Sequence, residues 1–412
     1  MIDNNEKKVL TDLARKYFEI AYNPNNDEKR TLWRNHNSLT ERVRPLVHIR
    51  PWACRELFPD ELFVCSDPFY RSLEFQLRYL LIQSSLNDDT VFEPYLKMDA
   101  VCKPPKEMRW GVKVSLGEKL NDGGAAAYAP VLLEESDFEK LIAPEHGIDE
   151  EKTAELMEMA YNATGGVIDI ASDRVNMFQS FSGDISTDLA KMRGLEQIMW
   201  DAYDRPEWLH KILGFMRDAI LKVHDQAERL GDFKPFNSFN QSVPYAAGLR
   251  DPVFSQESVR RKDIWCFIAA QEFTTFGSDM FEEFILRYQI PIMEKFGLVA
   301  YGCCEDLTND IKYLKKINNL RRISVTPFAN IEKCADQIGS DYVISWRPSP
   351  SEMVAFGFDE ASARKRIRDC FNIFKKNNCV FDVCLKDIET LNGKPESLFN
   401  FIRVVNEEIE NF

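Results

Sequence analysis

Short apolar runs and amphipathic segments alternate through the last third of the chain. Each apolar run is followed by a stretch with apolar residues at helical spacing, such as ASARKRIRDCFNIFKK. Buried parallel strands are short apolar runs, and the helices that connect them are amphipathic, so the pattern predicts four strand–helix units. The predicted strands are 297–302, 321–327, 341–346 and 379–385. Four such units make half of an eight-stranded barrel.

The middle of the chain is less regular, although several elements can still be predicted. Residues 167–171 have the composition of a strand, and residues 195–229 have the pattern of one or two helices. The polar, glycine-containing segment 237–248 predicts a long loop. Further helices are predicted around DIWCFIAAQEF, residues 263–273, and across residues 280–296.

A single domain is expected. The chain has 412 residues, a length that suits two or three domains or one elaborated α/β barrel. Because no Gly/Ser-rich or Pro-rich linker divides the sequence, we expect one domain over residues 1–412. Residues 1–130 are interpreted as an N-terminal elaboration and residues 160–412 as the main barrel. The expected fold class is therefore α/β, a (β/α)8 TIM barrel with an elaborated N-terminal region.

The charge of the chain narrows the classes of partner. It has 66 acidic and 52 basic residues, which gives a formal net charge of −14. Such a surface repels phosphate backbones and anionic lipids, so neither nucleic acid nor a membrane is an expected partner. No uncharged apolar stretch approaches about 18 residues, and the first residues contain no apolar signal core. We therefore expect a cytoplasmic protein.

One pair among the ten cysteines stands out. In a reducing compartment thiols stay free, and most of these cysteines lie singly among apolar residues, as buried thiols do. Cys303 and Cys304, however, directly follow the predicted strand 297–302 and precede Glu305 and Asp306. Barrel enzymes keep their active sites at this end of the strands, and thiols with carboxylates are ligands for Zn²⁺. Adjacent residues of an extended strand point oppositely, so both thiols face one pocket only if the chain has turned.

Further ligands or catalytic groups would come from other strand ends. Cys384 and Asp387 follow the last predicted strand, and Glu272 lies upstream in AAQEF. Histidine is a weaker candidate because none of the five follows residue 224, although His48 could fold in. The alternative is that the cysteines pack in the core and the carboxylates cap the next helix.

Basic, polar and aromatic residues are candidates for a substrate pocket. Arg347 follows a predicted strand between prolines and suits a carboxylate or phosphate group, with a structural ion pair as the alternative. The full set of candidate substrate-binding residues is Arg347, Phe273, Tyr245, Asn240, His48 and Arg50.

The stretch YGCCEDLTNDIKYLKKINNLRRISVTPFANIEKCADQIGSDYVISWRPSPS, residues 301–351, resembles the uroporphyrinogen decarboxylase-like superfamily. The segments VHIRPWACRELF, MRGLEQIMWDAYDRPEWL and LKDIETLNGKPESLFNFIRVV resemble it as well. The likeness extends from about residue 45 to the end and implies a single (β/α)8 barrel. The superfamily includes cofactor-free decarboxylases and zinc-dependent methyltransferases that move methyl groups to or from a corrinoid protein.

The motifs favour the methyltransferase branch. The RQAGRY motif of true decarboxylases is absent, and HIRPW is the nearest arginine signal. Methyltransferases of the superfamily hold zinc through a His-x-Cys motif and a later Cys. Here Tyr301 stands in the His place, Cys303 matches the first Cys and Cys384 lies near the last one. The resemblance implies an altered zinc site with the ligands Cys303, Cys304, Cys384 and Glu305, and with Glu305, Glu272 and Asp387 as catalytic carboxylates.

The expected function is a zinc-dependent methyltransferase. It would move a methyl group from a small donor, such as a phenyl methyl ether, to the cobalamin of a partner corrinoid protein, with zinc as the Lewis acid. One alternative is a cofactor-free decarboxylase of a polycarboxylic, uroporphyrinogen-like substrate, motivated by the fold and by Arg50, Arg193 and Arg347. Another is a non-catalytic binding module whose cysteines merely pack. The expected oligomeric states include a homodimer.

Overall fold

The chain folds around a curled parallel sheet. The structure, a computed structural model, describes residues 2–117 and 128–412. Six parallel strands are bonded in the order β1-β10-β9-β8-β7-β6, β2 and β5 form a separate parallel pair, and β3 and β4 an antiparallel pair. The strands are β1 (Leu46–Arg50), β2 (Tyr95–Asp99), β3 (Ser115–Leu116), β4 (Tyr128–Ala129), β5 (Asp169–Asp173), β6 (Trp265–Ile268), β7 (Leu298–Tyr301), β8 (Leu320–Val325), β9 (Val343–Trp346) and β10 (Val380–Lys386).

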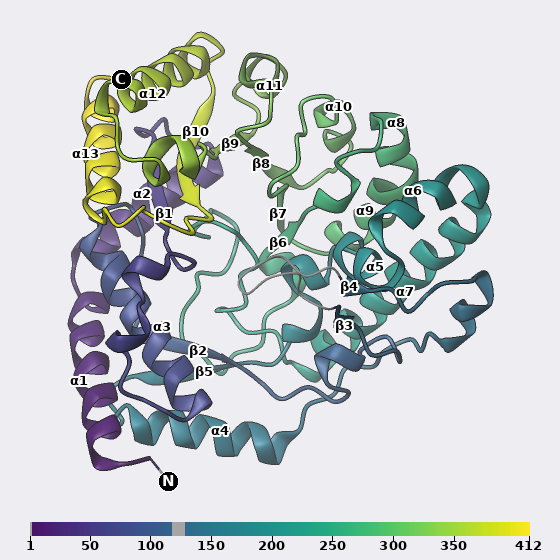
Figure 1. Cartoon of the computed structure of the whole chain (residues 1–412), viewed down its shortest axis with the longest axis horizontal. Coiled ribbons are helices and arrows are strands. Elements are labelled where there is room, and N and C mark those ends of the chain that lie inside the picture. Colours follow the sequence, from purple (N-terminus) through teal and green to yellow (C-terminus); the bar gives the residue numbers. More distant parts are fainter. Residues whose placement is uncertain (1, 118–127) are drawn as a thin grey trace.

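Helices cover the outer side of this sheet. Figure 1 shows the six strands as an arc with α10 to α13 along its outside, and the β2–β5 pair across the ring. The α-helices are α1 (Asn4–Ala21), α2 (Asn25–Ser38), α3 (Pro68–Ser85), α4 (Glu150–Ala163), α5 (Ser186–Arg193), α6 (Leu195–Asp204), α7 (Pro206–Leu230), α8 (Ser278–Phe281), α9 (Arg287–Met293), α10 (Ile311–Leu314), α11 (Ile331–Ile338), α12 (Glu360–Lys376) and α13 (Glu396–Glu410). None of the helices that the structure describes has the length and apolar character needed to cross a membrane.

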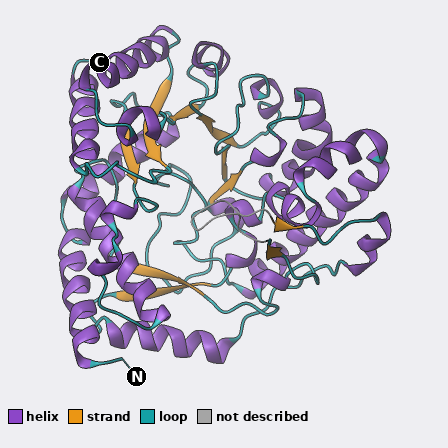
Figure 2. Cartoon of the chain, in the orientation of Figure 1, coloured by secondary structure: helices purple, strands orange, loops and turns teal. Residues whose placement is uncertain are grey.

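The four predicted strand–helix units are confirmed as β7–α10, β8–α11, β9–α12 and β10–α13. The predicted loop 237–248 is also confirmed, and Figure 2 shows the inside of the ring crossed by loops. The helix predicted around residues 263–273 is wrong, because this segment contains the buried apolar strand β6, at one edge of the sheet. A short apolar run that is buried on both faces has no periodicity that would separate strand from helix.

Side chains bond to the outer edge of β1 in place of a neighbouring strand, so the sheet does not continue to β2. The Val47 N–H donates to Asp89 Oδ2 at 2.8 Å, and the Ile49 N–H donates to Asp88 Oδ2 at 2.7 Å. The Ile49 carbonyl accepts from Gln83 Nε2 at 2.8 Å. Side chains from the end of α3 and from the α3–β2 connection therefore satisfy the groups that a neighbouring strand would bond. Among the described residues the sheet is a half-barrel, where the sequence suggests a closed one.

The concave side of the sheet is polar. Val383 and Leu385 of β10 belong to the main hydrophobic core. Successive side chains of a strand point to opposite faces, so Asp382, Cys384 and Lys386 face the interior of the curl. Although the region 1–130 is expected to be an elaboration, it supplies β1 to this sheet, in register with β10.

A buried ionic cluster joins α2 to the inner side of the sheet. Asp382 accepts from Arg322 of β8 at 2.7 Å and lies 3.0 Å from His36 Nε2 of α2. Burial opposes ionisation of Asp382, but the Arg322 charge and the His36 contact outweigh it and lower the pKa of the carboxyl. Asn37 accepts from Arg322 and donates to the carbonyls of the 243–245 segment. The α2 helix thus seals one end of the half-barrel.

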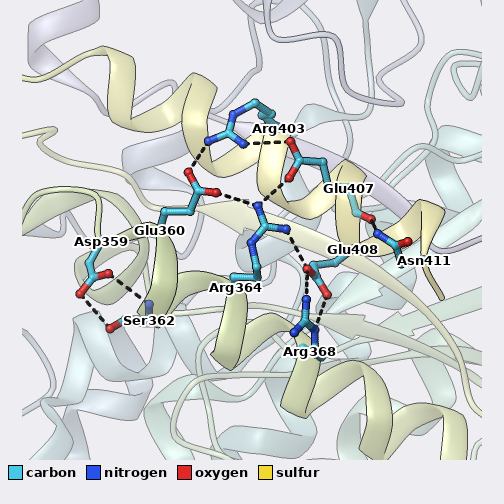
Figure 3. Close-up of polar contacts among 9 residues, drawn as sticks. All are labelled: Asp359, Glu360, Ser362, Arg364, Arg368, Arg403, Glu407, Glu408 and Asn411. Carbon is cyan, nitrogen blue, oxygen red and sulfur yellow. Dashed lines mark hydrogen bonds and ion pairs between the residues drawn. The ribbon is translucent and has the colours of Figure 1, made fainter.

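The last two helices are joined by an exposed network of ion pairs (Figure 3). Arg364 of α12 contacts Glu360 in its own helix at 2.7 Å, and Glu407 of α13 at 2.6 Å. Glu408, which is almost fully buried, accepts from Arg364 and Arg368. The network fixes α13 against α12, next to the sheet edge formed by β10 and β1.

We predict that Asp382→Ala destabilises the protein by about 3–5 kcal/mol, because it leaves the Arg322 guanidinium buried without its counter-charge. Urea unfolding followed by circular dichroism measures this. Asp341→Ala, at an exposed site, is the control and should change the free energy of unfolding by less than about 0.5 kcal/mol. Equal stability of the two variants would contradict the assigned role of the cluster.

Asp88 predicts a pH dependence of stability. Burial, opposed by the hydrogen bonds from Ile49 and Thr90, raises the pKa of Asp88 from 3.8 to about 6. The folded state binds this proton more tightly, so the contribution of Asp88 to stability is present below pH 3.8 and is lost as the pH rises through about 6. Relative to Asp88→Asn, the wild type should lose about 2–3 kcal/mol between pH 4 and 7. Parallel stability curves for the two proteins would refute this.

Candidate functional site

A turn at the end of β7 brings two thiols to one side. Gly302 has φ +96°, and a Cβ atom there would lie 2.6 Å from Leu307 Cδ1 and 3.2 Å from Ser324 Cβ. A residue with a side chain would therefore be strained as well as crowded. The turn breaks the alternation of the strand, and the sulfur atoms of Cys303 and Cys304 lie 3.4 Å apart.

Lys386, the last residue of β10, contacts both thiols. Its Nζ atom is 3.4 Å from Cys303 Sγ and 3.4 Å from Cys304 Sγ, and it also pairs with the Asp387 carboxylate. Cys303 and Lys386 are buried, whereas Cys304 is exposed. The three side chains form what we call the Cys303–Cys304–Lys386 cluster.

The cluster is polarised by its neighbours. A hydrogen bond from the Cys304 thiol, together with the charges of Arg347 and Lys386, outweighs burial and lowers the pKa of Cys303 to about 6. The same hydrogen bond and burial raise the pKa of Cys304. Burial and Arg347 lower the pKa of Lys386, but Cys303 and Asp387 raise it more, so it lies above its ordinary value. These directions favour a thiolate at Cys303, a thiol at Cys304 and an ammonium group at Lys386.

Two buried residues hold the cysteine loop in place. Glu305 accepts from the Cys303 N–H at 2.8 Å through one carboxylate oxygen and from the Ala270 N–H at 2.9 Å through the other. Arg347, which follows β9, donates to the Cys303 carbonyl. Glu305 therefore ties the end of β6 to the turn after β7. With both oxygens bonded to backbone N–H groups, it acts as a positioning residue.

The cluster opens into a cavity of about 550 Å³. Phe328 and Phe356 supply an apolar rim and are 78% and 82% exposed. Arg347 lies in its wall, only 5% exposed, with an Nε atom that has no hydrogen-bond partner among the described residues. The lining comprises Cys303, Cys304, Thr326, Pro327, Phe328, Arg347, Pro348, Ser349, Pro350, Ser351, Ala355, Phe356, Lys386, Asp387, Glu389, Thr390 and Asn392.

Three other candidate residues lie on β1 and β10, outside the lining of this cavity. Cys384 lies two residues before Lys386 on β10, and burial raises the pKa of its thiol. His48 is its register partner on β1, hydrogen-bonded to Thr90 Oγ1 at 2.9 Å, and burial followed by the charge of Arg50 lowers its pKa to about 3. Arg50, in register with Lys386, lines a separate cavity of about 570 Å³.

The remaining candidates lie outside the lining of the cavity. Glu272 accepts from Ser186 at 2.8 Å and from Thr187 at 3.0 Å. Phe273 is buried against Phe276. Tyr245 is hydrogen-bonded to Arg30 of α2 and to Glu93. Asn240 caps the Ser242 N–H at 3.0 Å.

Two residues of the site were not among the sequence candidates. Lys386 stands directly before the candidate Asp387 in LKDIET, and its position on the inner face of the last strand was the available signal. Gln241, next to the candidate Asn240, donates to Cys303 Sγ at 3.7 Å. It comes from the loop 237–248, whose path over the sheet no local pattern reveals.

The zinc ligands expected from the sequence do not converge. Both oxygens of Glu305 are bonded to backbone N–H groups, and the Lys386 Nζ atom already contacts both thiols. Across residues 2–117 and 128–412, no group of three or more His, Cys, Asp or Glu side chains is arranged to hold a metal ion. The arrangement fits an ammonium group better than a metal, and zinc stays a prediction.

Comparison with known proteins shows a similar fold. No protein-family profile and no curated protein matches the sequence. Among solved structures, a methyltransferase from Methanosarcina mazei is similar, with a TM-score of 0.50 and 10% sequence identity. The similarity covers 92% of this chain and 98% of that one. At this identity the likeness shows a shared TIM-barrel-like α/β fold over nearly the whole of both chains.

We predict that Gly302→Ala disrupts the cluster. Positive φ and the contact with Leu307 should lower the free energy of unfolding by about 1–3 kcal/mol and separate the two thiols. Urea unfolding and the rate of thiol alkylation measure the two effects. Gly277→Ala, where a Cβ atom meets nothing within 4 Å, is the matched control. A variant with wild-type stability and alkylation rate would show that the turn does not need glycine.

Proposed function

We propose that the protein is a methyltransferase that moves a methyl group from a small donor, such as a phenyl methyl ether, to the cobalamin of a separate corrinoid protein. The observation that carries the proposal is the Cys303–Cys304–Lys386 cluster, which lies in a cavity at the carboxyl ends of β7 and β10. TIM-barrel-like enzymes place their chemistry at this end of the strands. The similar fold of a methyltransferase adds support.

Lys386 is the group best placed to assist departure of the demethylated product. The partner's cobalamin supplies the nucleophile that attacks the methyl carbon. As the carbon–oxygen bond of the donor breaks, its electron pair moves to the oxygen. A hydrogen bond from the Lys386 ammonium group stabilises this charge. The two sulfur atoms and Asp387 hold the ammonium group in place, within a mostly buried pocket where its charge is weakly screened.

Arg347 and the aromatic rim would orient the donor. The Arg347 guanidinium is buried in the cavity wall and forms no ion pair with a carboxylate in the described part of the chain, so it suits a donor that carries one. Phe328 and Phe356 offer ring faces to an apolar or aromatic donor. The volume of about 550 Å³ is in the range of small-molecule sites and leaves room for a small donor.

Arg193, one of the three arginines that motivate the decarboxylase alternative, does not lie at the cavity. Arg193 is buried against Asp201 at 2.7 Å and donates to the carbonyls of Leu132 and Leu133, so it holds the fold together away from the cavity. Arg50 and Arg347 remain near the inner end of the sheet. The assay below therefore includes release of CO₂ from uroporphyrinogen as a separate measurement.

We predict that methyl transfer from methoxybenzene or 4-methoxybenzoate to cob(I)alamin, followed by the absorbance of methylcobalamin, depends on the cluster. Lys386→Met should lower the rate about 10²–10⁴-fold, because it removes the cationic donor. Cys303→Ser should lower it about 10–100-fold, because it removes one of the two anionic partners that position Lys386. Lys365→Met, an exposed lysine of α12 paired with Asp369, is the control and should keep the wild-type rate.

The outcomes of this assay are separable. No methyl transfer by the wild type to free or protein-bound cobalamin would overturn the proposal, as would full activity of Lys386→Met. Metal analysis of the active protein tests the zinc prediction independently. A stoichiometric zinc that is lost in Cys303→Ser would show that Cys303 helps to hold a metal.

A further inference from the structure

Cys303 and Cys304 differ from the other cysteines in their contacts and exposure. All ten cysteines are free thiols, and nine of them are buried. Cys304 is the exposed one, and its sulfur lies 3.4 Å from that of Cys303. By contrast, Cys379 donates to the Ala335 carbonyl and Cys102 to Asn176 Oδ1. The pair at β7 combines contact between two sulfurs with access from outside.

Small oxidants can reach both atoms of the pair. Cys304 is exposed, and Cys303, although buried, forms part of the cavity wall. The Lys386 ammonium group lies 3.4 Å from each sulfur, so a negative sulfur and the hydroxide that leaves a peroxide both have a cation beside them. Redox-sensitive cysteines share these features, namely access, a nearby cation and a resolving thiol.

We propose that Cys303 and Cys304 are a site of reversible covalent modification, at which a peroxide oxidises the two thiols to a vicinal disulfide. In the first step the Cys303 sulfur attacks one peroxide oxygen, the O–O bond breaks, and a sulfenic acid and one water form. In the second step the Cys304 sulfur attacks the sulfenic sulfur, the S–O bond breaks, and the disulfide and a second water form. In sum, two thiols and one hydrogen peroxide give one disulfide and two waters.

Such a disulfide would be easily reduced. Neighbouring Cα atoms are about 3.8 Å apart, whereas most disulfides join Cα atoms about 4.4–6.8 Å apart. The resulting strain favours reduction by dithiols, as is typical of labile rather than structural disulfides. The turn at Gly302 already points both sulfurs to the same side, so oxidation needs only a local shift of the loop.

Oxidation would also dismantle the cluster. A disulfide carries no negative charge and donates no hydrogen bond, so Lys386 would keep only Asp387 as an anionic partner. The effect on activity rests on the proposed function, because it follows from the role of Lys386 there. The formation of the disulfide does not rest on it.

The test uses the full-length protein and hydrogen peroxide. Trypsin releases the peptide Phe296–Lys312, which contains Cys303 and Cys304 and no other cysteine. After peroxide treatment and alkylation, we expect this peptide to escape alkylation, to weigh about 2 Da less than the reduced peptide, and to regain two alkylation sites after dithiothreitol. The peptides that carry the other eight cysteines should remain alkylated after unfolding, as in the untreated protein.

Two variants make the outcome decisive. Cys304→Ser removes the resolving thiol, so dimedone should trap a sulfenic acid on Cys303. Cys379→Ser removes a buried thiol elsewhere and should oxidise like the wild type. The proposal is overturned if the wild-type peptide stays reduced, or if it gains two oxygen atoms and dithiothreitol does not restore it. If the disulfide forms but no methyl transfer is found in any state, this inference stands and the proposed function fails.

Discussion

The contact of Asp382 with Arg322 and His36 fixes the register of the strands that carry the candidate site. A carboxylate and a guanidinium inside the curled sheet lose their hydration, and only good mutual geometry offsets that loss. This geometry exists in a single register of β8, β9 and β10. A shift of one residue would turn Asp382 toward the helices and expose Val383 to the polar interior. Lys386 lies four residues further along the same face, so the ionic cluster at one end fixes the ammonium group at the other.

The polar interior distinguishes this fold from barrels packed with branched aliphatic residues. Besides the ionic cluster, Ser324, Ser345, Cys384 and His48 belong to this inner side. The hydrophobic core lies instead between the sheet and its helices, where Val383 and Leu385 are buried. The sheet is stabilised from its outer side, and its inner side is free to carry charge.

Much of the fold could be predicted from local pattern. The last four strands are short apolar runs that each precede an amphipathic helix, and their predicted ranges lie within a few residues of the observed bounds. The position of Cys303 at a strand end also follows from this pattern. The strand β6 could not be distinguished from a helix, because WCFIAA is apolar at every position. The role of Glu305 depends on an N–H group at Ala270, and that of Lys386 on the register of β10 with β1 and β9. Contacts between residues far apart in the chain leave no signal in the spacing of either partner.

The carboxylates of Asp88 and Asp89, which bond to the edge of β1, affect how molecules of this protein associate. An open sheet exposes a row of N–H and C=O groups, to which a strand from another chain can add. Asp88, Asp89 and Gln83 already occupy these groups along β1, and the negative charge of the two aspartates repels an incoming backbone carbonyl. The half-barrel can therefore stay open at this edge without offering a template for fibre growth.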